Sequence, residues 1–262
     1  MRGRVLAAAL VCCGLAAPAA QAQLPLPIGG TPPSDPPPQQ QPSPAKERPT
    51  PAYAKLSDER EITRWASPLQ RAIVRRRPDS KAKRITRLRY DTEDGYPEVY
   101  LALRSYTGPH GKEWLEVRLP MRPNGRKGWV PRSAFGRLRT VNTFLSIDRG
   151  SLRATLYRAG RPIWRSRVGV GKRSTPTPAG DFWIREKLGP LRGGSIYGPL
   201  AFGTAAYSRL SEWPGGGVIG IHGTNEPELI PGRPSHGCIR VRNPDIARLG
   251  KLMPIGTPVR IG

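Results

Sequence analysis

Short apolar runs rich in β-branched and aromatic residues recur along the chain beyond about residue 52, and such runs between turn sequences predict β-strands. In the first part of this region, turn sequences rich in proline and glycine separate the runs. The strands predicted there cover residues 72–74, 99–103, 114–119 and 128–130. Strands this short at this spacing are typical of a small antiparallel barrel, which we expect over residues 53–139.

From Thr140 onward the pattern stays β-like, with a hairpin predicted over 144–157 and a further strand over 163–168. Residues 189–217 are rich in glycine and have no clear period, which is typical of a functional loop or lid. Near the end, Asn243 is predicted as the N-cap of a short helix, with Pro244 at its first position. We therefore expect a mainly β domain over 140–262 with one short C-terminal helix.

The N-terminal end has the features of an export signal. A basic start, an apolar run from Val5 to Ala17 and a small-residue cleavage site predict a signal peptide over 1–22. The run is shorter than the roughly 20 residues that cross a bilayer, which disfavours a retained anchor. A lipoprotein signal through Cys12 or Cys13 is a weaker alternative. Residues 23–52 are rich in proline and predict an extended linker. We expect an exported, cell-wall-associated protein without a transmembrane span after cleavage.

The formal net charge of +24 is strongly basic. Nucleic-acid binding is one interpretation of such a charge. The basic residues are spread along the chain, and an exported protein meets little nucleic acid, so anionic wall polymers are the preferred partners. No sequence motif calls for a metal or an organic cofactor.

Two of the three histidines lie close to Cys238, which is the one cysteine that remains after removal of the leader. A thiol with an ordinary pKa is mostly protonated at neutral pH, and an imidazole can take its proton during attack. His222 follows an apolar strand and is the predicted base, with the carbonyl of Gly223 or a neighbour orienting its ring. His236 is two residues before the thiol, where it can tune the thiolate or line the substrate site.

Three neighbours of the thiol have predicted supporting roles. Gly237 lets the backbone bend, so that its amide and that of Cys238 can bind an oxyanion. Arg240 can bind a substrate carboxylate, although the chain has many arginines. Ser235 shapes the turn or contacts substrate.

The motif Ser235-His236-Gly237-Cys238-Ile239-Arg240 with His222 upstream resembles the signature of the L,D-transpeptidase family. The likeness covers about 140–262 and implies a mainly β catalytic domain that acts on donor and acceptor stem peptides of peptidoglycan. It implies an acyl-thioester on the cysteine and acylation by carbapenems. The candidate substrate-binding residues also include Gly223 and Thr224. Tyr197, Phe202 and Trp213 are candidates to line the substrate cleft, with burial in the core as the equal alternative. The stretch 114–135 resembles bacterial SH3-like domains, which implies a wall-binding or positioning module, or merely a packing domain.

Other functions remain to be weighed against this one. A papain-like endopeptidase places its cysteine before its histidine, which is the reverse of the order here. A zinc site from His222, His236 and Cys238 has enough ligands but lacks the helical zinc-binding motif. A non-catalytic wall-binding protein is the third alternative. Within the favoured family the acyl acceptor can be a stem amine, water or a protein lysine.

Overall fold

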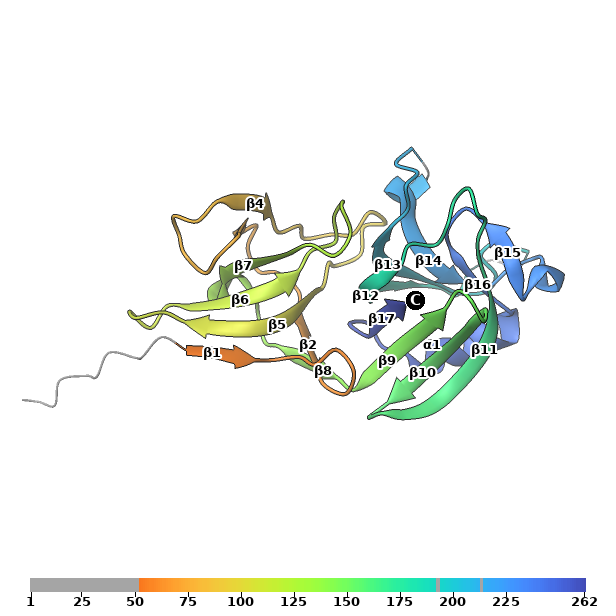
Figure 1. The fold of residues 1–262 in the computed structure, drawn as a ribbon, viewed down its shortest axis with the longest axis horizontal. Coiled ribbons are helices and arrows are strands. Elements are labelled where there is room, and N and C mark those ends of the chain that lie inside the picture. Colours follow the sequence, from red (N-terminus) through yellow and green to blue (C-terminus); the bar gives the residue numbers. More distant parts are fainter. Residues whose placement is uncertain (1–51, 192–193, 213) are drawn as a thin grey trace, which may run out of the picture. The chain divides into compact units, whose positions relative to one another are not determined.

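The computed structural model describes residues 52–262 apart from 192–193 and 213. The predicted signal peptide and nearly all of the predicted linker lie outside these residues. Within the described part, the chain is mainly β and has one α-helix close to its C-terminal end (Figure 1). The predicted fold class is confirmed to this extent, whereas the SH3-like nature of the first barrel stays a prediction.

The N-terminal sheet contains eight strands in the order β4-β3-β7-β6-β5-β2-β8, with β1 paired to β5. Its pairings are antiparallel, as the short strands and tight turns predict. The strands are β1 (Ala52–Lys55), β2 (Thr63–Ala66), β3 (Ile73–Arg75), β4 (Arg84–Arg87), β5 (Tyr100–Thr107), β6 (Glu113–Arg118), β7 (Lys127–Pro131) and β8 (Arg139–Val141). The 3-10 helix η1 (Arg132–Ala134) follows β7.

The C-terminal sheet contains nine strands in the order β10-β9-β17-β12-β13-β14-β16-β11-β15. An additional pairing of β10 with β11 brings this path back on itself, so the sheet closes like a barrel. The strands are β9 (Thr143–Asp148), β10 (Arg153–Arg158), β11 (Arg161–Gly171), β12 (Gly180–Leu188), β13 (Ala201–Tyr207), β14 (Val218–His222), β15 (Gly232–Ser235), β16 (Ile239–Val241) and β17 (Pro258–Ile261). The helix α1 (Asn243–Leu252) follows β16, and the short 3-10 helices are η2 (Pro214–Gly217) and η3 (Pro227–Leu229).

Strand β5 faces two hydrophobic cores, which explains its unbroken apolar start. Tyr100 and Ala102 point into the core of the N-terminal sheet, and Leu101 and Leu103 point into the core of the C-terminal sheet. Successive side chains of a strand point to opposite faces, so this alternation buries all four. Trp183 of β12 adds a bond from its Nε1 to the carbonyl of Val99, at 2.9 Å. The two sheets therefore share one packed boundary.

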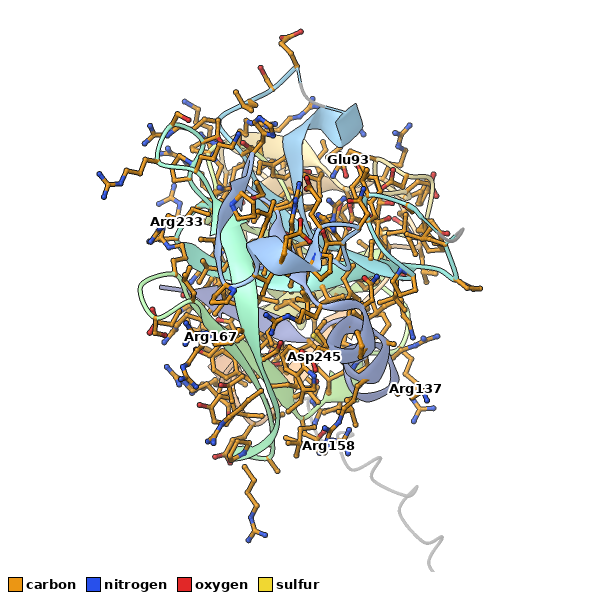
Figure 2. The ribbon with its side chains drawn as sticks, turned by 90° about the vertical axis from the view of Figure 1, so that its right-hand side faces the viewer. Glu93, Arg137, Arg158, Arg167, Arg233 and Asp245 are labelled. Carbon is orange, nitrogen blue, oxygen red and sulfur yellow. The ribbon has the colours of Figure 1, made fainter. Side chains whose placement is uncertain are left out.

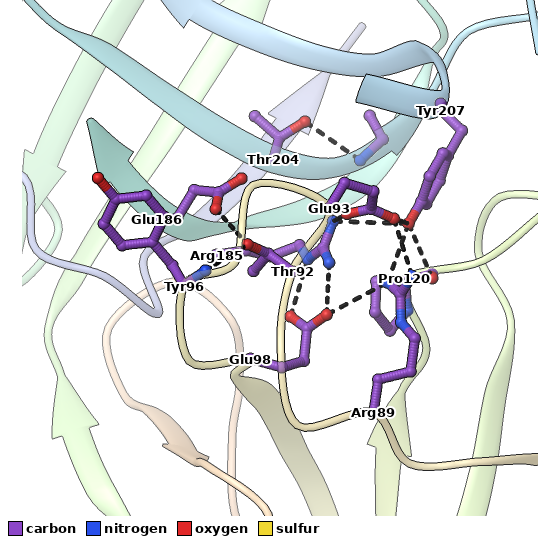
Figure 3. Close-up of polar contacts among 12 residues, drawn as sticks. Arg89, Thr92, Glu93, Tyr96, Glu98, Pro120, Arg185, Glu186, Thr204 and Tyr207 are labelled. Carbon is purple, nitrogen blue, oxygen red and sulfur yellow. Dashed lines mark hydrogen bonds and ion pairs between the residues drawn. The ribbon is translucent and has the colours of Figure 1, made fainter. Parts of the chain in front are cut away.

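A buried ionic network crosses the same boundary (Figure 3). Arg185 of β12 is fully buried and forms ion pairs with Glu98 and Glu93, both from the segment before β5. Burial alone would raise the pKa of Glu93, but Arg185 and a hydrogen bond from the Tyr207 hydroxyl lower it to about 2. Arg89 joins both carboxylates as well. Each of these four side chains, Arg89, Glu93, Glu98 and Arg185, thus has an opposite charge beside it.

Two details differ from the sequence predictions. Residues 201–207, expected to belong to an irregular loop, form the central strand β13, because their small residues pack closely against neighbouring strands. The helix is confirmed, but the predicted cap was wrong by one residue. Arg242 occupies the N-cap without a side-chain bond. The Asn243 side chain instead accepts a hydrogen bond from the Thr224 backbone, at 2.8 Å.

Arginine side chains extend from many elements instead of gathering on one of them. Figure 2 shows Arg137 near β8, Arg158 and Arg167 from β10 and β11, and Arg233 from β15. This spread agrees with the even distribution of basic residues in the sequence. No helix among the described residues has the length and apolar character needed to cross a membrane.

Candidate active site

Cys238 lies in the bend between β15 and β16, immediately before Ile239, the first residue of β16. Strand β16 runs parallel to β14, with Ile239 opposite Ile221 and Arg240 opposite His222. Its other side pairs with β11. The cysteine is therefore held at the start of a central strand, and its side chain is half-buried. The strand that begins after Cys238 is thus paired on both sides, which fixes the position of the cysteine backbone.

His222 and Cys238 face each other across Gly220 of β14. Residues two apart on a strand share a face, so Gly220 and His222 lie on the same side of β14. The Gly220 N–H donates to Cys238 Sγ at 3.4 Å. A Cβ on Gly220 would lie 3.5 Å from His222 Cδ2 and 3.8 Å from Cys238 Sγ. The absent side chain leaves the space in which thiol and imidazole can approach each other.

The ring of His222 is held by its own neighbour in sequence. Its Nδ1 lies 2.6 Å from the carbonyl oxygen of Gly223. A carbonyl can only accept, so Nδ1 carries the proton and Nε2 keeps a free lone pair. Tyr197 packs edge-on against the ring, with centroids 5.0 Å apart. Burial, with a smaller effect of Arg240, lowers the pKa of His222 to about 4, so the ring is neutral at pH 7.

The thiol of Cys238 is also neutral at rest. Burial raises its pKa, although the Gly220 N–H and the nearby Arg240 act in the opposite direction. Arg240 forms an ion pair with Glu226, which compensates part of its charge. A protonated thiol beside an imidazole with a free Nε2 is the arrangement in which the base takes the proton during attack.

A hydrogen-bonded turn shapes the backbone around the nucleophile. Ser235 Oγ donates to the Cys238 carbonyl at 2.6 Å and accepts from the Gly237 N–H at 3.1 Å. Thr177 Oγ1 donates to the Gly237 carbonyl at 2.7 Å and accepts from the Gly171 N–H at 2.9 Å. Gly237 has φ of +133°, and a Cβ there would lie 2.8 Å from Ile219 Cδ1. Only glycine fits this position.

A small cleft exposes the thiol and the imidazole together. Side chains of the two reactive residues line it along with Tyr197, His236 and Arg240. Its remaining walls come from the strand ends of β13 and β14 and their neighbours, namely Ile196, Ser208, Gly217, Val218, Ile219 and Ser235. The walls combine apolar groups with a few polar ones, as is usual for substrate clefts.

Comparison with known proteins agrees with this geometry. The YkuD family profile, described as the L,D-transpeptidase catalytic domain, matches residues 142–261. YkuD of Bacillus subtilis is 35% identical over 126 residues, which are 47% of this chain and 67% of that protein. This chain belongs to the L,D-transpeptidase family. YkuD of Bacillus licheniformis is 38% identical over 117 residues, covering 45% of this chain and 62% of its own length.

Two solved structures match a similar part of the chain. The catalytic domain of the E. faecium L,D-transpeptidase is 23% identical, with a TM-score of 0.36, over 46% of this chain and 96% of that one. Bd1075 of Bdellovibrio bacteriovorus is 28% identical, with a TM-score of 0.38, over 47% of this chain and 48% of that one.

The structure brings several predicted site residues together and moves others away. Tyr197, His236 and Arg240 line the cleft with the reactive pair. Of the two alternatives for Phe202, the structure has the core, because the side chain is fully buried in the core of the C-terminal sheet. Thr224 was placed wrongly, since it is fully buried and its hydroxyl accepts from the Glu226 N–H. Trp213 lies outside the described residues.

The predicted oxyanion site also needs a correction. The Gly237 N–H is already bonded to Ser235, whereas the N–H of Cys238 has no hydrogen-bond acceptor among the described residues. Ser235 therefore shapes the turn, and Gly223 acts through its carbonyl on the His222 ring.

Thr177 and Gly220 were assigned no role from the sequence, although Thr177 bonds the Gly237 carbonyl and the Gly220 N–H donates to Cys238 Sγ. Gly220 had a signal, because it alternates with His222 on an apolar strand. Thr177 had only its place in a proline-rich loop. Among the described residues, no group of three or more His, Cys, Asp or Glu side chains is arranged to hold a metal ion.

Proposed function

We propose that this protein is a peptidoglycan L,D-transpeptidase that cross-links third stem residues through an acyl-thioester on Cys238. The observation that carries the proposal is the neutral pair of Cys238 and His222, whose Nε2 is left free by the bond to Gly223. Membership of the family supplies the substrate class, which is the stem peptide of peptidoglycan.

The reaction begins when His222 Nε2 takes the thiol proton as Cys238 Sγ attacks the carbonyl of the third stem residue. The Cys238 N–H stabilises the oxyanion of the tetrahedral intermediate. Collapse breaks the bond to the terminal D-alanine, and His222 returns the proton to the leaving amine. The product of this half-reaction is a thioester between Cys238 and the shortened donor peptide.

The second half-reaction reverses these roles. An amine of a neighbouring stem attacks the thioester carbonyl, and His222 removes a proton from that amine. Collapse breaks the carbon–sulfur bond and returns the proton to the thiolate.

The N-terminal part of the chain is included in the proposal. A signal peptide removed after Ala22 exports the protein, and the proline-rich linker extends the catalytic part from the membrane or through the wall. The N-terminal sheet is an SH3-like module that positions the enzyme on the wall. N-terminal sequencing of the mature protein tests the leader, and sedimentation of the isolated full chain with purified wall sacculi tests wall binding.

The deciding experiment incubates the mature protein with disaccharide-tetrapeptides and analyses products by mass spectrometry. Dimers linked through third residues, lost in Cys238→Ala and in His222→Gln, support the proposal. Trimmed tripeptides alone point to a carboxypeptidase, and transfer only to a protein lysine points to an anchoring transferase. Activity that is lost with a chelator would instead support the zinc alternative, whereas activity that survives a chelator and is lost on thiol alkylation would eliminate it.

A further inference from the structure

The turn between β6 and β7 extends from the N-terminal sheet to the strand end that borders the cleft. Arg122 and Asn124 of this turn contact backbone groups of the β13–β14 connection. The connection links Tyr207, the last residue of β13, with Val218, the first residue of β14. Two sheets are thus joined by side chains at a point beside the reactive residues.

Asn124 holds the end of β13 as a neighbouring strand would. Its Nδ2 donates to the Tyr207 carbonyl at 2.9 Å, and its Oδ1 accepts from the Tyr207 N–H at 3.0 Å. Both backbone groups of one residue are therefore satisfied by one side-chain amide. The Tyr207 hydroxyl is fixed as well, because it donates to Glu93 at 2.6 Å and accepts from Arg89 Nη2 at 3.2 Å (Figure 3).

Arg122 ties the two limbs of the connection to each other. Its Nη2 donates to the carbonyl of Ser208 at 3.0 Å and to that of Gly216 at 2.9 Å. The limbs meet again where the Ser208 N–H donates to the Gly217 carbonyl, at 2.8 Å. A Cβ on Gly217 would lie 2.1 Å from the carbonyl oxygen of Leu210, so the limbs approach as closely as glycine permits.

The residues held in this way belong to the wall of the substrate cleft. Ser208, Gly217, Val218 and Ile219 all line the cleft that contains Cys238. Ile219 and Ser208 also lie closest to the space where a Cβ on Gly237 would point, with Ile219 Cδ1 at 2.8 Å. The position of the β13–β14 connection therefore sets the width of the cleft beside the nucleophile.

Polar contacts carry this attachment, because apolar packing does not fill the space beside it. A hollow of about 690 Å³ is lined by Arg122, Pro123 and Asn124 on one side and by residues 176–179 on another. Replacing Arg122 or Asn124 therefore removes the side-chain contacts that attach the connection to the turn, while the hydrogen bond between Ser208 and Gly217 remains.

We propose that Arg122 and Asn124 are positioning residues of the active site, which hold the β13–β14 connection in the arrangement that admits the donor peptide. This inference rests on the proposed function. Neither side chain touches the reacting atoms, since both act through Tyr207, Ser208 and Gly216. When these contacts are lost, the connection is less ordered, and binding of the donor peptide must order it. KM for the donor therefore rises, while the chemistry of the thiol and imidazole is preserved.

The test compares the full mature chain with Arg122→Gln, Asn124→Ala and the double variant. Arg126→Gln is the matched control, because it removes the same charge from the same turn and its side chain has no hydrogen-bond or ion-pair partner among the described residues. We expect KM for the tetrapeptide donor to rise about tenfold in the double variant, from the loss of two or more net hydrogen bonds. We expect kcat to change less than about threefold, and Arg122→Lys to recover part of the loss.

Two kinetic results would overturn the inference. One is an unchanged KM in a double variant that has the near-ultraviolet spectrum of the wild type. The other is an equal rise of KM in Arg126→Gln, which would show an effect of charge alone.

A second measurement separates this inference from the proposed function. If the wild type acts on no tetrapeptide, the proposed function fails, but hydrogen exchange still reports on positioning. Backbone amides of Ser208 and Val218 should exchange faster in the double variant than in the wild type or in Arg126→Gln. Equal exchange in all three proteins contradicts the positioning role, whatever the substrate is. This measurement also decides the matter if the double variant is too unstable for steady-state kinetics.

Discussion

The rate at which iodoacetamide alkylates Cys238 at a series of pH values shows whether the resting thiol is protonated before substrate binds. Burial raises the pKa of the Cys238 thiol and lowers that of the His222 imidazole to about 4. Both shifts favour the neutral pair of thiol and imidazole over the pair of thiolate and imidazolium. We therefore predict that Cys238 in the resting enzyme at pH 7 reacts as a neutral thiol, not as the thiolate of a preformed ion pair.

The expected magnitude follows from the thiolate fraction. An ordinary cysteine with a pKa of about 8.5 is about 3% ionised at pH 7, and the raised pKa of Cys238 makes its fraction smaller. Only the thiolate reacts, so the alkylation rate should increase about tenfold per pH unit from about pH 6 to about pH 8. An ion pair would instead give a nearly constant rate throughout that interval.

The variant His222→Gln gives a second test between the neutral thiol–imidazole pair and the thiolate–imidazolium pair. Removing a neutral imidazole should change the alkylation rate at pH 7 by less than about threefold, although it abolishes proton transfer in acyl transfer. The rate is measured by following loss of free Cys238 with mass spectrometry. A plateau of reactivity reaching below about pH 6, or a large fall of the pH 7 rate in His222→Gln, would refute the reasoning.

The remaining predictions concern the space between the reactive residues and the buried charges. Gly220→Val should reduce kcat/KM by about 100-fold or more, because its methyl groups fill the gap beside Cys238, while the melting temperature stays within a few degrees. Glu98→Ala should lower the free energy of unfolding by about 3–5 kcal/mol in a denaturant titration, because Arg185 is then buried without its closest counter-charge. Burial raises the pKa of Glu186, so the stability that the protonated carboxyl contributes is lost as pH rises above the ordinary carboxyl range. The variant Glu186→Gln should therefore melt at a higher temperature than the wild type at pH 7. The difference in melting temperature should shrink towards pH 4. If the two melting curves differ equally at both pH values, the carboxyl is not the cause.

Strands whose apolar residues pack into one core were predictable from the sequence. The orientation of a strand between two cores, and the existence of a strand made largely of small residues, were not. The run 99–103 was predicted as a strand from its apolar character alone. Its division between two cores, with Leu101 on one side and Tyr100 on the other, depends on the second sheet. Strand β13 was missed because residues 201–207 have small side chains without a visible period. Such a strand is specified by what packs on it.

The site followed a similar division. Cys238 and His222 were predicted as nucleophile and base from residue chemistry and chain order, because they are close in the sequence, and the structure places both on one cleft. The bond of Asn243 to Thr224 joins residues from different elements, so the residue was interpreted as a helix cap instead. The contact between Arg122 and Ser208 had no local signal, since it links two sheets that are far apart along the chain.

The central claim is that the reaction passes through a thioester on Cys238. Rapid acid quenching of the mature protein with a disaccharide-tetrapeptide, followed by mass spectrometry of the peptide that contains Cys238, tests it directly. We expect an adduct with the mass of the donor minus D-alanine, formed before any cross-linked product and lost in Cys238→Ala. A meropenem adduct at the same residue is expected by the same attack. Cross-linked products that accumulate without an adduct on Cys238, or that persist in Cys238→Ala, would contradict the account.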